Sequence, residues 1–453
     1  MRFGLKERSR VIVWVMMIIS LLVCTGCKLS WGGDSVSEDE QDTGFARDIE
    51  RVSIASDGSQ ADGDSEEPSI SSDGRIVAFI SDATNLVPGD TNGVPDVFVH
   101  DLDTGITERV SVPSVGPQAD DEAFTLSLSS DGRFVAFGSF ATNLIAGDTN
   151  GVLDVFIRDR TIGTTARVSI ASDGTQANDE SFYPAVSSDG RFVAFRSDAT
   201  NLVANDTNNT SDIFVRDRLA GTTERISVAS GGTQANGNSI SPAISSDGRF
   251  VAFSSEASNL VAGDTNNKAD IFVHDRQDDT TELIAGPAEF DTGSGIIIVA
   301  PSISPDGDFV GFESDADDLV PGDTNNRFDT FLVDRGTLGA ERLSVSSSEV
   351  EGNSDSGRPS LSFNNRYAVF SSIATNLVSQ DTNGSEDVFV RDRDAGQTRR
   401  ASLAFDGSQG DNNSFSAVIS EDGQFIAFTA FAENLVANDT NGAFDIFVIP
   451  NPF

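Results

Sequence analysis

Apolar and polar positions along this chain form short runs separated by turn-forming residues, a pattern typical of β-strands. In the first clear example, strands are predicted over residues 68–71, 75–81, 96–101 and 107–112. The turn at Asp73-Gly74 suits a tight hairpin, because Asp-Gly accommodates positive φ. Both faces of the second strand are apolar, so this four-stranded unit must be covered on both sides.

The four-strand unit repeats along the chain, and an Asp-Thr-Asn phrase returns every 58 or 59 residues. The first residues of its seven copies are Asp90, Asp148, Asp206, Asp264, Asp323, Asp381 and Asp439. A fixed period indicates a repeat architecture, and four strands per repeat is the content of a propeller blade. Stacking the blades in a ring buries every apolar face. We therefore predict an all-β fold, a seven-bladed β-propeller of four-stranded antiparallel blades over residues 48–453.

The two ends of the repeat region predict how the ring closes. The last copy stops after its third strand, residues 445–449, whereas an extra fourth-strand phrase, residues 50–54, precedes the first copy. We expect this N-terminal strand to complete the last blade, so that no blade is left with an unpaired edge.

The N-terminal segment has the pattern of a bacterial export signal. A basic start is followed by an apolar run over residues 11–23, too short for a comfortable membrane span. The run ends in Val23-Cys24-Thr25-Gly26-Cys27, which resembles a lipobox with Cys24 where Leu is usual. We expect residues 1–26 to be a lipoprotein signal peptide and Cys27 to carry the lipid. Residues 27–47 are polar and acidic and are predicted to be a flexible tether.

This leader predicts a bacterial cell envelope protein, lipid-anchored at the outer membrane or cell surface. An ordinary cleaved signal, with a secreted or periplasmic product, is the alternative. No cysteine follows Cys27, so the predicted mature protein has no disulfide within the chain.

The composition is strongly acidic, with 71 Asp and Glu against 30 Lys and Arg and a net charge of -41. Such a surface repels phosphate backbones and anionic lipid, so nucleic acid is excluded as a partner and membrane contact is expected only through the lipid. Cations and basic surfaces are favoured. Solubility, or adaptation to a salty habitat, is the alternative explanation of the charge.

A sequence resemblance supports the propeller. The phrase Ser-x-Asp-Gly-Arg before an apolar strand, followed by Asp-(Ile/Val)-Phe-Val-x-Asp, resembles the WD-like repeat of TolB-type bacterial envelope proteins. Ser304-Pro305-Asp306-Gly307 matches that pattern most closely, whereas the sixth copy has Asn364-Asn365 in place of Asp-Gly. The resemblance implies the propeller fold but no single activity, because members bind proteins, bind ligands or carry hydrolase domains.

Two long, acidic loops of each repeat are predicted to lie on one face of the ring. In the first copy they are the loop before the first strand, residues 55–67, and the loop between the second and third strands, residues 82–95. The other connections are tight turns. We expect a protein or peptide partner to dock on the long-loop face of a monomer.

The Asp-Thr-Asn loops offer a candidate metal site. Oxygen ligands at positions 1, 3 and 7 partly resemble a calcium loop, although position 5 lacks an oxygen donor in most copies. The alternative is that these side chains only cap a tight turn. The candidate Ca²⁺ ligands are Asp90, Asn92, Asp96, Asp148, Asn150, Asp154, Asp206, Asn208, Asp212, Asp264, Asn266, Asp270, Asp323, Asn325, Asp329, Asp381, Asn383, Asp387, Asp439, Asn441 and Asp445.

No catalytic residue is predicted. His100 and His274 are the only histidines, and because other copies have Arg at this position we expect both to be solvated. A Gly-x-Ser-x-Gly nucleophile elbow is absent from the sequence. Near-identical blades also argue against one specialised site.

We therefore predict a non-catalytic, envelope-anchored scaffold that binds a protein or peptide. The alternatives are a calcium-dependent adhesion or glycan-binding module and an enzyme that acts on glycans with carboxylates.

Overall fold

A computed structural model describes residues 48–264, 268–284 and 301–453. Within this part every element is a β-strand, and the strands form seven four-stranded antiparallel sheets. No helix in the described ranges is long and apolar enough to cross a membrane. The predicted signal peptide, Cys27 and the tether lie outside the described residues.

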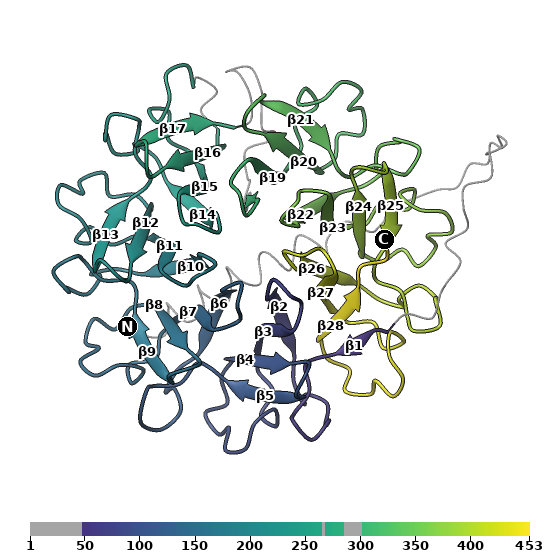
Figure 1. Cartoon of the computed structure of the whole chain (residues 1–453), viewed down its shortest axis with the longest axis horizontal. Coiled ribbons are helices and arrows are strands. Elements are labelled where there is room, and N and C mark those ends of the chain that lie inside the picture. The colour runs from purple at the N-terminus through teal and green to yellow at the C-terminus, as the bar shows by residue number, and fades with distance from the viewer. Residues whose placement is uncertain (1–47, 265–267, 285–300) are drawn as a thin grey trace. The chain divides into compact units, whose positions relative to one another are not determined.

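Each sheet is one blade, with strands a to d running from the ring axis outward (Figure 1). The a strands are β2 Ser65–Ile70, β6 Ala123–Leu128, β10 Ser181–Val186, β14 Ser239–Ile244, β18 Ser302–Ile303, β22 Ser356–Leu361 and β26 Ser414–Ile419. The b strands are β3 Ile76–Ser81, β7 Phe134–Ser139, β11 Phe192–Ser197, β15 Phe250–Ser255, β19 Phe309–Ser314, β23 Tyr367–Ser372 and β27 Phe425–Ala430. The c strands are β4 Asp96–Asp101, β8 Asp154–Asp159, β12 Asp212–Asp217, β16 Asp270–Asp275, β20 Asp329–Asp334, β24 Asp387–Asp392 and β28 Asp445–Pro450. The d strands are β5 Ile106–Arg109, β9 Thr164–Arg167, β13 Thr222–Arg225, β17 Thr280–Leu283, β21 Gly339–Arg342, β25 Gln397–Arg400 and, for the seventh blade, β1 Glu50–Arg51.

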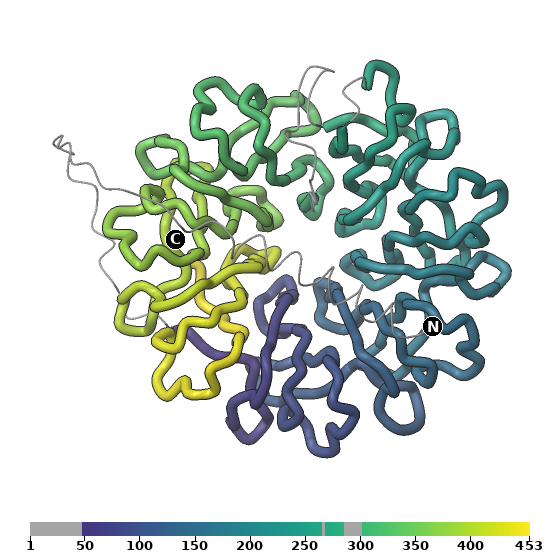
Figure 2. Tube along the Cα trace, turned by 180° about the vertical axis from the view of Figure 1, so that it is seen from behind, coloured from purple at the N-terminus to yellow at the C-terminus, as the bar shows by residue number. Residues whose placement is uncertain are grey.

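The seventh blade contains both ends of the ring, as predicted. Its strand order is β1-β28-β27-β26, and Glu50 and Arg51 are the register partners of Val448 and Phe447. Figure 2 shows the same ring from behind, with the first described residues beside the last blade. The seven-bladed propeller closed by its N-terminal strand is therefore confirmed.

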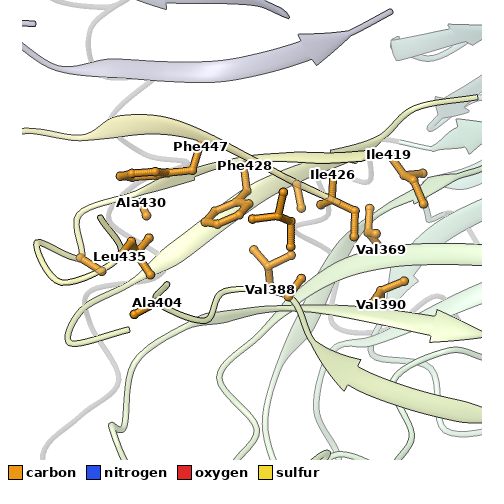
Figure 3. Packing of buried hydrophobic residues seen from close by; sticks show 14 of the residues in the cluster. Val369, Val388, Val390, Ala404, Ile419, Ile426, Phe428, Ala430, Leu435 and Phe447 are labelled. Atoms are coloured by element: carbon orange, nitrogen blue, oxygen red, sulfur yellow. The ribbon is translucent and has the colours of Figure 1, made fainter. Parts of the chain in front are cut away.

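The core consists of apolar layers between successive blades. In every blade a Phe on strand b and a Phe on strand c face each other, with ring centroids 5.8–6.0 Å apart. Between the sixth and seventh blades, Val388 and Val390 pack with Ile426 and Phe428 in one buried cluster (Figure 3). Burial of such large side chains from water is the main stabilising contribution to the ring.

The a–b hairpins also join neighbouring blades. Gly190 in the third blade has φ +69°, and a Cβ at this position would lie 2.1 Å from the Phe134 ring of the second blade. Glycine is required here for its conformation and for the close approach. Beside this turn, Arg191 binds Asp217 through two nitrogens at 3.1 and 2.7 Å, which holds the pKa of Asp217 down at about 2.

Candidate functional site

Each Asp-Thr-Asn loop except the fourth is held by an arginine at the end of strand d. In the first blade, Arg109 Nη1 lies 2.9 Å from both Asp90 Oδ1 and Asp96 Oδ2. Asn92 Nδ2 donates to Asp96 Oδ2 at 3.1 Å and to the Ala119 carbonyl at 3.2 Å. The equivalent arginines are Arg51, Arg167, Arg225, Arg342 and Arg400.

In those six blades the guanidinium lies between the two carboxylates that a bound cation would need. A planar cation with several donors suits a buried pair of carboxylates well. Within the described ranges, no group of three His, Cys, Asp or Glu side chains is placed to hold a metal ion. The fourth blade has Leu283 in place of the arginine, and Asn266 of its loop lies outside the described residues. Calcium binding by these loops remains a prediction.

The two long loops of the repeat hydrogen-bond to each other on one face. Asn85 Nδ2 donates to the Gln60 carbonyl at 2.7 Å, and the Thr84 hydroxyl donates to Asp62 at 2.8 Å. Gln60 Oε1 in turn accepts from the Thr440 amide of the seventh blade at 3.2 Å. One d–a loop therefore connects the b–c loops of two blades, and the loops form a continuous, cross-linked surface.

The histidines differ from the prediction, because both are buried. His100 is 1% exposed and its Nδ1 lies 2.8 Å from the Thr107 hydroxyl; His274 is 4% exposed and makes the same contact with Thr281 at 2.9 Å. Burial lowers the pKa of both imidazoles. The sequence did not indicate that the histidines are buried, because arginine occupies the same position in other blades. There the arginine makes the equivalent contact with threonine: Arg158 Nη1 lies 3.1 Å from Thr165 Oγ1.

The a strands carry a bulge where they leave the long-loop face. Six of the seven have a non-glycine residue in the left-handed region at this point, with φ between 36° and 54°. The residues are Glu67, Thr125, Tyr183, Ser241, Arg358 and Ser416. Bulges redirect side chains and often occur next to functional sites. The a strands that carry these residues are the innermost strands of the ring (Figure 1).

The repeats differ from one another at these positions, although their framework is nearly constant. The six residues at the bulge, listed above, include acidic, basic, aromatic and hydroxyl side chains. The residues immediately before the bulge are Glu66, Phe124, Phe182, Ile240, Gly357 and Phe415. Sequence reasoning missed this set. A comparison of the copies position by position carries the signal, because side chains that pack between blades are nearly constant and those at these two positions vary from copy to copy.

Aromatic side chains gather where the a strands begin. Phe124 and Phe140 meet edge to face with centroids 5.6 Å apart, and Phe415 and Phe431 lie 5.6 and 5.0 Å from Phe444. All five rings are half-buried. Partly exposed aromatic side chains of this kind are typical of binding surfaces.

Arg358 is the centre of a charged group from several blades. Its Nη1 donates to the Ser416 hydroxyl, and its backbone amide donates to Glu313 Oε2 at 3.2 Å. Gly357 makes room for this carboxylate, since a Cβ there would lie 2.0 Å from Glu313 Oε2.

Four carboxyls lie within the electrostatic influence of Arg358. Burial raises the pKa of Glu66, Glu67, Glu313 and Glu386, and Arg358 opposes each shift. The pKa values of Glu66 and Glu386 rise to about 7. Burial and the nearby Glu67 also raise the pKa of Tyr183. We call these six residues, Glu66, Glu67, Tyr183, Glu313, Arg358 and Glu386, the inner-strand site.

A pocket of about 200 Å³ lies close to this site, between the third and fourth blades. Arg196, Asn238, Ile240, Ser254 and Glu256 are among its lining residues. The Arg196 guanidinium lies over the Phe182 ring at 5.0 Å and 3.3 Å from Asp198. The inner end of the long-loop face thus combines charged groups, aromatic rings and a small cavity.

The a–b turns at the opposite end are joined across the axis by one carboxylate. Glu421 Oε1 accepts from the hydroxyls of Ser130, Ser188 and Ser246 at 2.5, 3.3 and 3.2 Å. These serines belong to three different blades, so Glu421 reaches across the ring. The a–b turns of the second, third, fourth and seventh blades are therefore linked to one another at this end of the axis.

Comparisons with known proteins give the same architecture. No family model matches the chain, and no curated protein sequence matches it. Among solved structures, an oligogalacturonate lyase in complex with manganese has a TM-score of 0.52 at 14% identity, covering 89% of this chain and 93% of that chain. The β-propeller domain of the Trilobed protease from Pyrococcus furiosus has a TM-score of 0.51 at 11% identity, covering 85% and 93%.

A third match is TolB from Acinetobacter baumannii, with a TM-score of 0.38 at 14% identity, covering 79% of this chain and 76% of that chain. The Pyrococcus domain has an open velcro topology, whereas here β1 pairs with β28. At these identities the similarity is one of fold, and it places this chain among the β-propellers.

Proposed function

We propose that this protein is a non-catalytic scaffold that binds a protein or peptide segment on its long-loop face, centred on the inner-strand site. One observation carries the proposal: the blades share their packing residues, and six of the seven share the loop-closing arginine, yet they differ at the bulge of the innermost strands. A framework alone would not require such differences. A site that recognises one asymmetric partner would.

The long-loop face also suits a binding role physically. Its loops are cross-linked by side-chain hydrogen bonds, so little conformational entropy is lost when a partner docks. Its aromatic rings are the residue type that dominates the energetics of interfaces. The two histidines contact threonines inside the blades, and the ionisable groups of the inner-strand site, among the described residues, are carboxyls, Arg358 and Tyr183.

The cell envelope is the proposed location, on the basis of the leader and Cys27. Metabolic labelling with a palmitate analogue tests the anchor: the wild-type protein should be labelled, and a Cys27→Ala variant should not. Label on both proteins, or on neither, would contradict lipid attachment at Cys27.

Affinity capture from an envelope extract tests the binding role. The full-length protein should retain a partner that Phe124→Ser/Phe415→Ser loses, because that variant removes two rings of the long-loop face. Phe363→Ser is the matched control. Phe363 is 54% exposed and lies in an a–b turn, at the opposite end of the blade from the long loops. Equal retention by all three proteins, each checked for an unchanged melting curve, would contradict the proposal.

A further inference from the structure

We infer that the inner-strand site binds a lysine- or arginine-bearing segment of the partner. This inference rests on the proposed function and names the chemistry of its ligand.

The charge balance of the site leaves room for a cation. Glu66 and Glu67 come from the first blade, Glu313 from the fifth, and Glu386 and Arg358 from the sixth. One guanidinium therefore faces four carboxyls. Within the described ranges Arg358 forms no ion pair as short as 4.0 Å, so it does not neutralise any of them directly.

Three of these carboxyls also lack partners. Within the described part of the chain, the side chains of Glu66, Glu67 and Glu386 accept no hydrogen bond and join no ion pair. All three side chains are half-buried, so an incoming ammonium or guanidinium group would meet carboxylates that have no charge partner of their own and could form charge-assisted hydrogen bonds with them. The buried carboxylates of the Asp-Thr-Asn loops show the contrast, because an arginine of the same chain satisfies them.

The neighbouring side chains suit the rest of a basic residue. Phe182 and Tyr183 lie with ring centroids 6.2 Å apart, and Arg196 already lies over Phe182. The aliphatic stem of a lysine or arginine packs well on aromatic rings, and its charged head is attracted by the ring face. A bare metal ion fits less well, because the carboxyls come from three blades and form no group placed for metal coordination in the described ranges.

Fluorescence anisotropy with labelled peptides tests the inference on the full-length protein. The probes are three Gly-Ser peptides that contain four lysines, four glutamines or four glutamates. We expect the lysine peptide to bind at least about tenfold more tightly than the glutamine peptide, and the glutamate peptide not to bind. Added salt should weaken the lysine complex.

Two variants with the same change in charge locate the site. Glu66→Gln/Glu67→Gln should weaken the lysine peptide by about tenfold or more, since each neutralised carboxyl removes a charge partner. Asp103→Asn/Asp394→Asn is the control: both residues lie in c–d turns, away from the long-loop face, and their side chains are 70% and 78% exposed. The control should bind like the wild type.

Equal affinity for the lysine and glutamine peptides would overturn the inference, and so would equal losses in the two variants. A partner captured from the envelope extract distinguishes the two proposals. If it binds Glu66→Gln/Glu67→Gln as tightly as the wild type, the basic-segment inference fails and the binding function stands.

Discussion

The guanidinium of Arg51 lies 2.8 Å from Asp439 and 3.1 Å from Asp445, which are 388 and 394 residues later in the chain. Arg167 forms the same contacts with Asp148 and Asp154 inside one blade. The contact that holds a loop within an ordinary blade therefore also closes the ring. Ser53 adds to it, because its hydroxyl donates to Asp445 Oδ1 at 2.5 Å.

Replacement of Arg51 or Arg167 by leucine should destabilise the protein by a similar amount. Each change leaves two buried carboxylates without their cation, which costs about 3 kcal/mol. Urea denaturation of the two variants measures the loss. Arg399→Leu is a control, because Arg399 contacts the Pro452 carbonyl and the Phe453 ring and holds no pair of carboxylates. A loss below about 1 kcal/mol for Arg51→Leu and Arg167→Leu would show that these pairs are not important for stability.

Calcium and chelator should leave the melting temperature of the wild-type protein nearly unchanged, because in six of the seven blades an arginine side chain lies between the loop carboxylates. A metal at 100 times its dissociation constant would add about 2.7 kcal/mol per site. Differential scanning calorimetry with CaCl2 and with EDTA makes the measurement. A reproducible rise of several degrees with calcium would favour the alternative, a calcium-dependent module.

Gly190→Ala should destabilise the ring far more than Gly174→Ala. Both glycines have positive φ, +69° and +89°, so both variants carry the cost of a side chain in the left-handed region, about 1 kcal/mol. Only at Gly190 would the new Cβ collide with a neighbouring blade, whereas it meets nothing within 4 Å at Gly174. Thermal melting compares the two. Equal melting temperatures for the two variants would show that the neighbouring blade accommodates the added methyl group at Gly190 with little loss of stability.

Binding of the lysine peptide should tighten as the pH rises from 6 to 8. The pKa values of Glu66 and Glu386 are raised from 4.5 to about 7, so these carboxyls are largely neutral at pH 6 and largely ionised at pH 8. Lysine keeps its charge throughout this range. Anisotropy titrations at several pH values measure the trend, and Glu66→Gln/Glu386→Gln should abolish it. A wild-type affinity that does not change with pH would show that these carboxyls do not contact the peptide.

The fold was predictable from sequence because it follows from local repetition. The Asp-Gly turns, the apolar b and c strands and the split seventh blade each have a local signal, and all of them agree. The Arg51 phrase before the first repeat indicated the closing strand. Burial of His100 was not predictable, because it depends on a hydrogen bond to Thr107 across the sheet.

The inner-strand site was harder to predict for a physical reason. Its residues are far apart in the sequence and share no motif, since Glu67, Tyr183 and Arg358 occupy the same repeat position with different chemistry. The ring alone brings them together. The repeated Asp-Thr-Asn phrase, in contrast, is plain in the sequence, although six of its copies bind arginines of their own blades.

Site-specific photo-crosslinking in living cells tests whether a partner protein binds at the inner-strand site. A photoreactive residue at Glu256, which is exposed and lines the pocket beside the inner-strand site, should crosslink to a partner protein. The same residue at Thr161, exposed in a c–d turn, should not. The Glu256 product should also disappear when Glu66→Gln/Glu67→Gln is added. Crosslinks at Thr161 with none at Glu256 would show that the partner binds at the c–d turns and not at the inner-strand site.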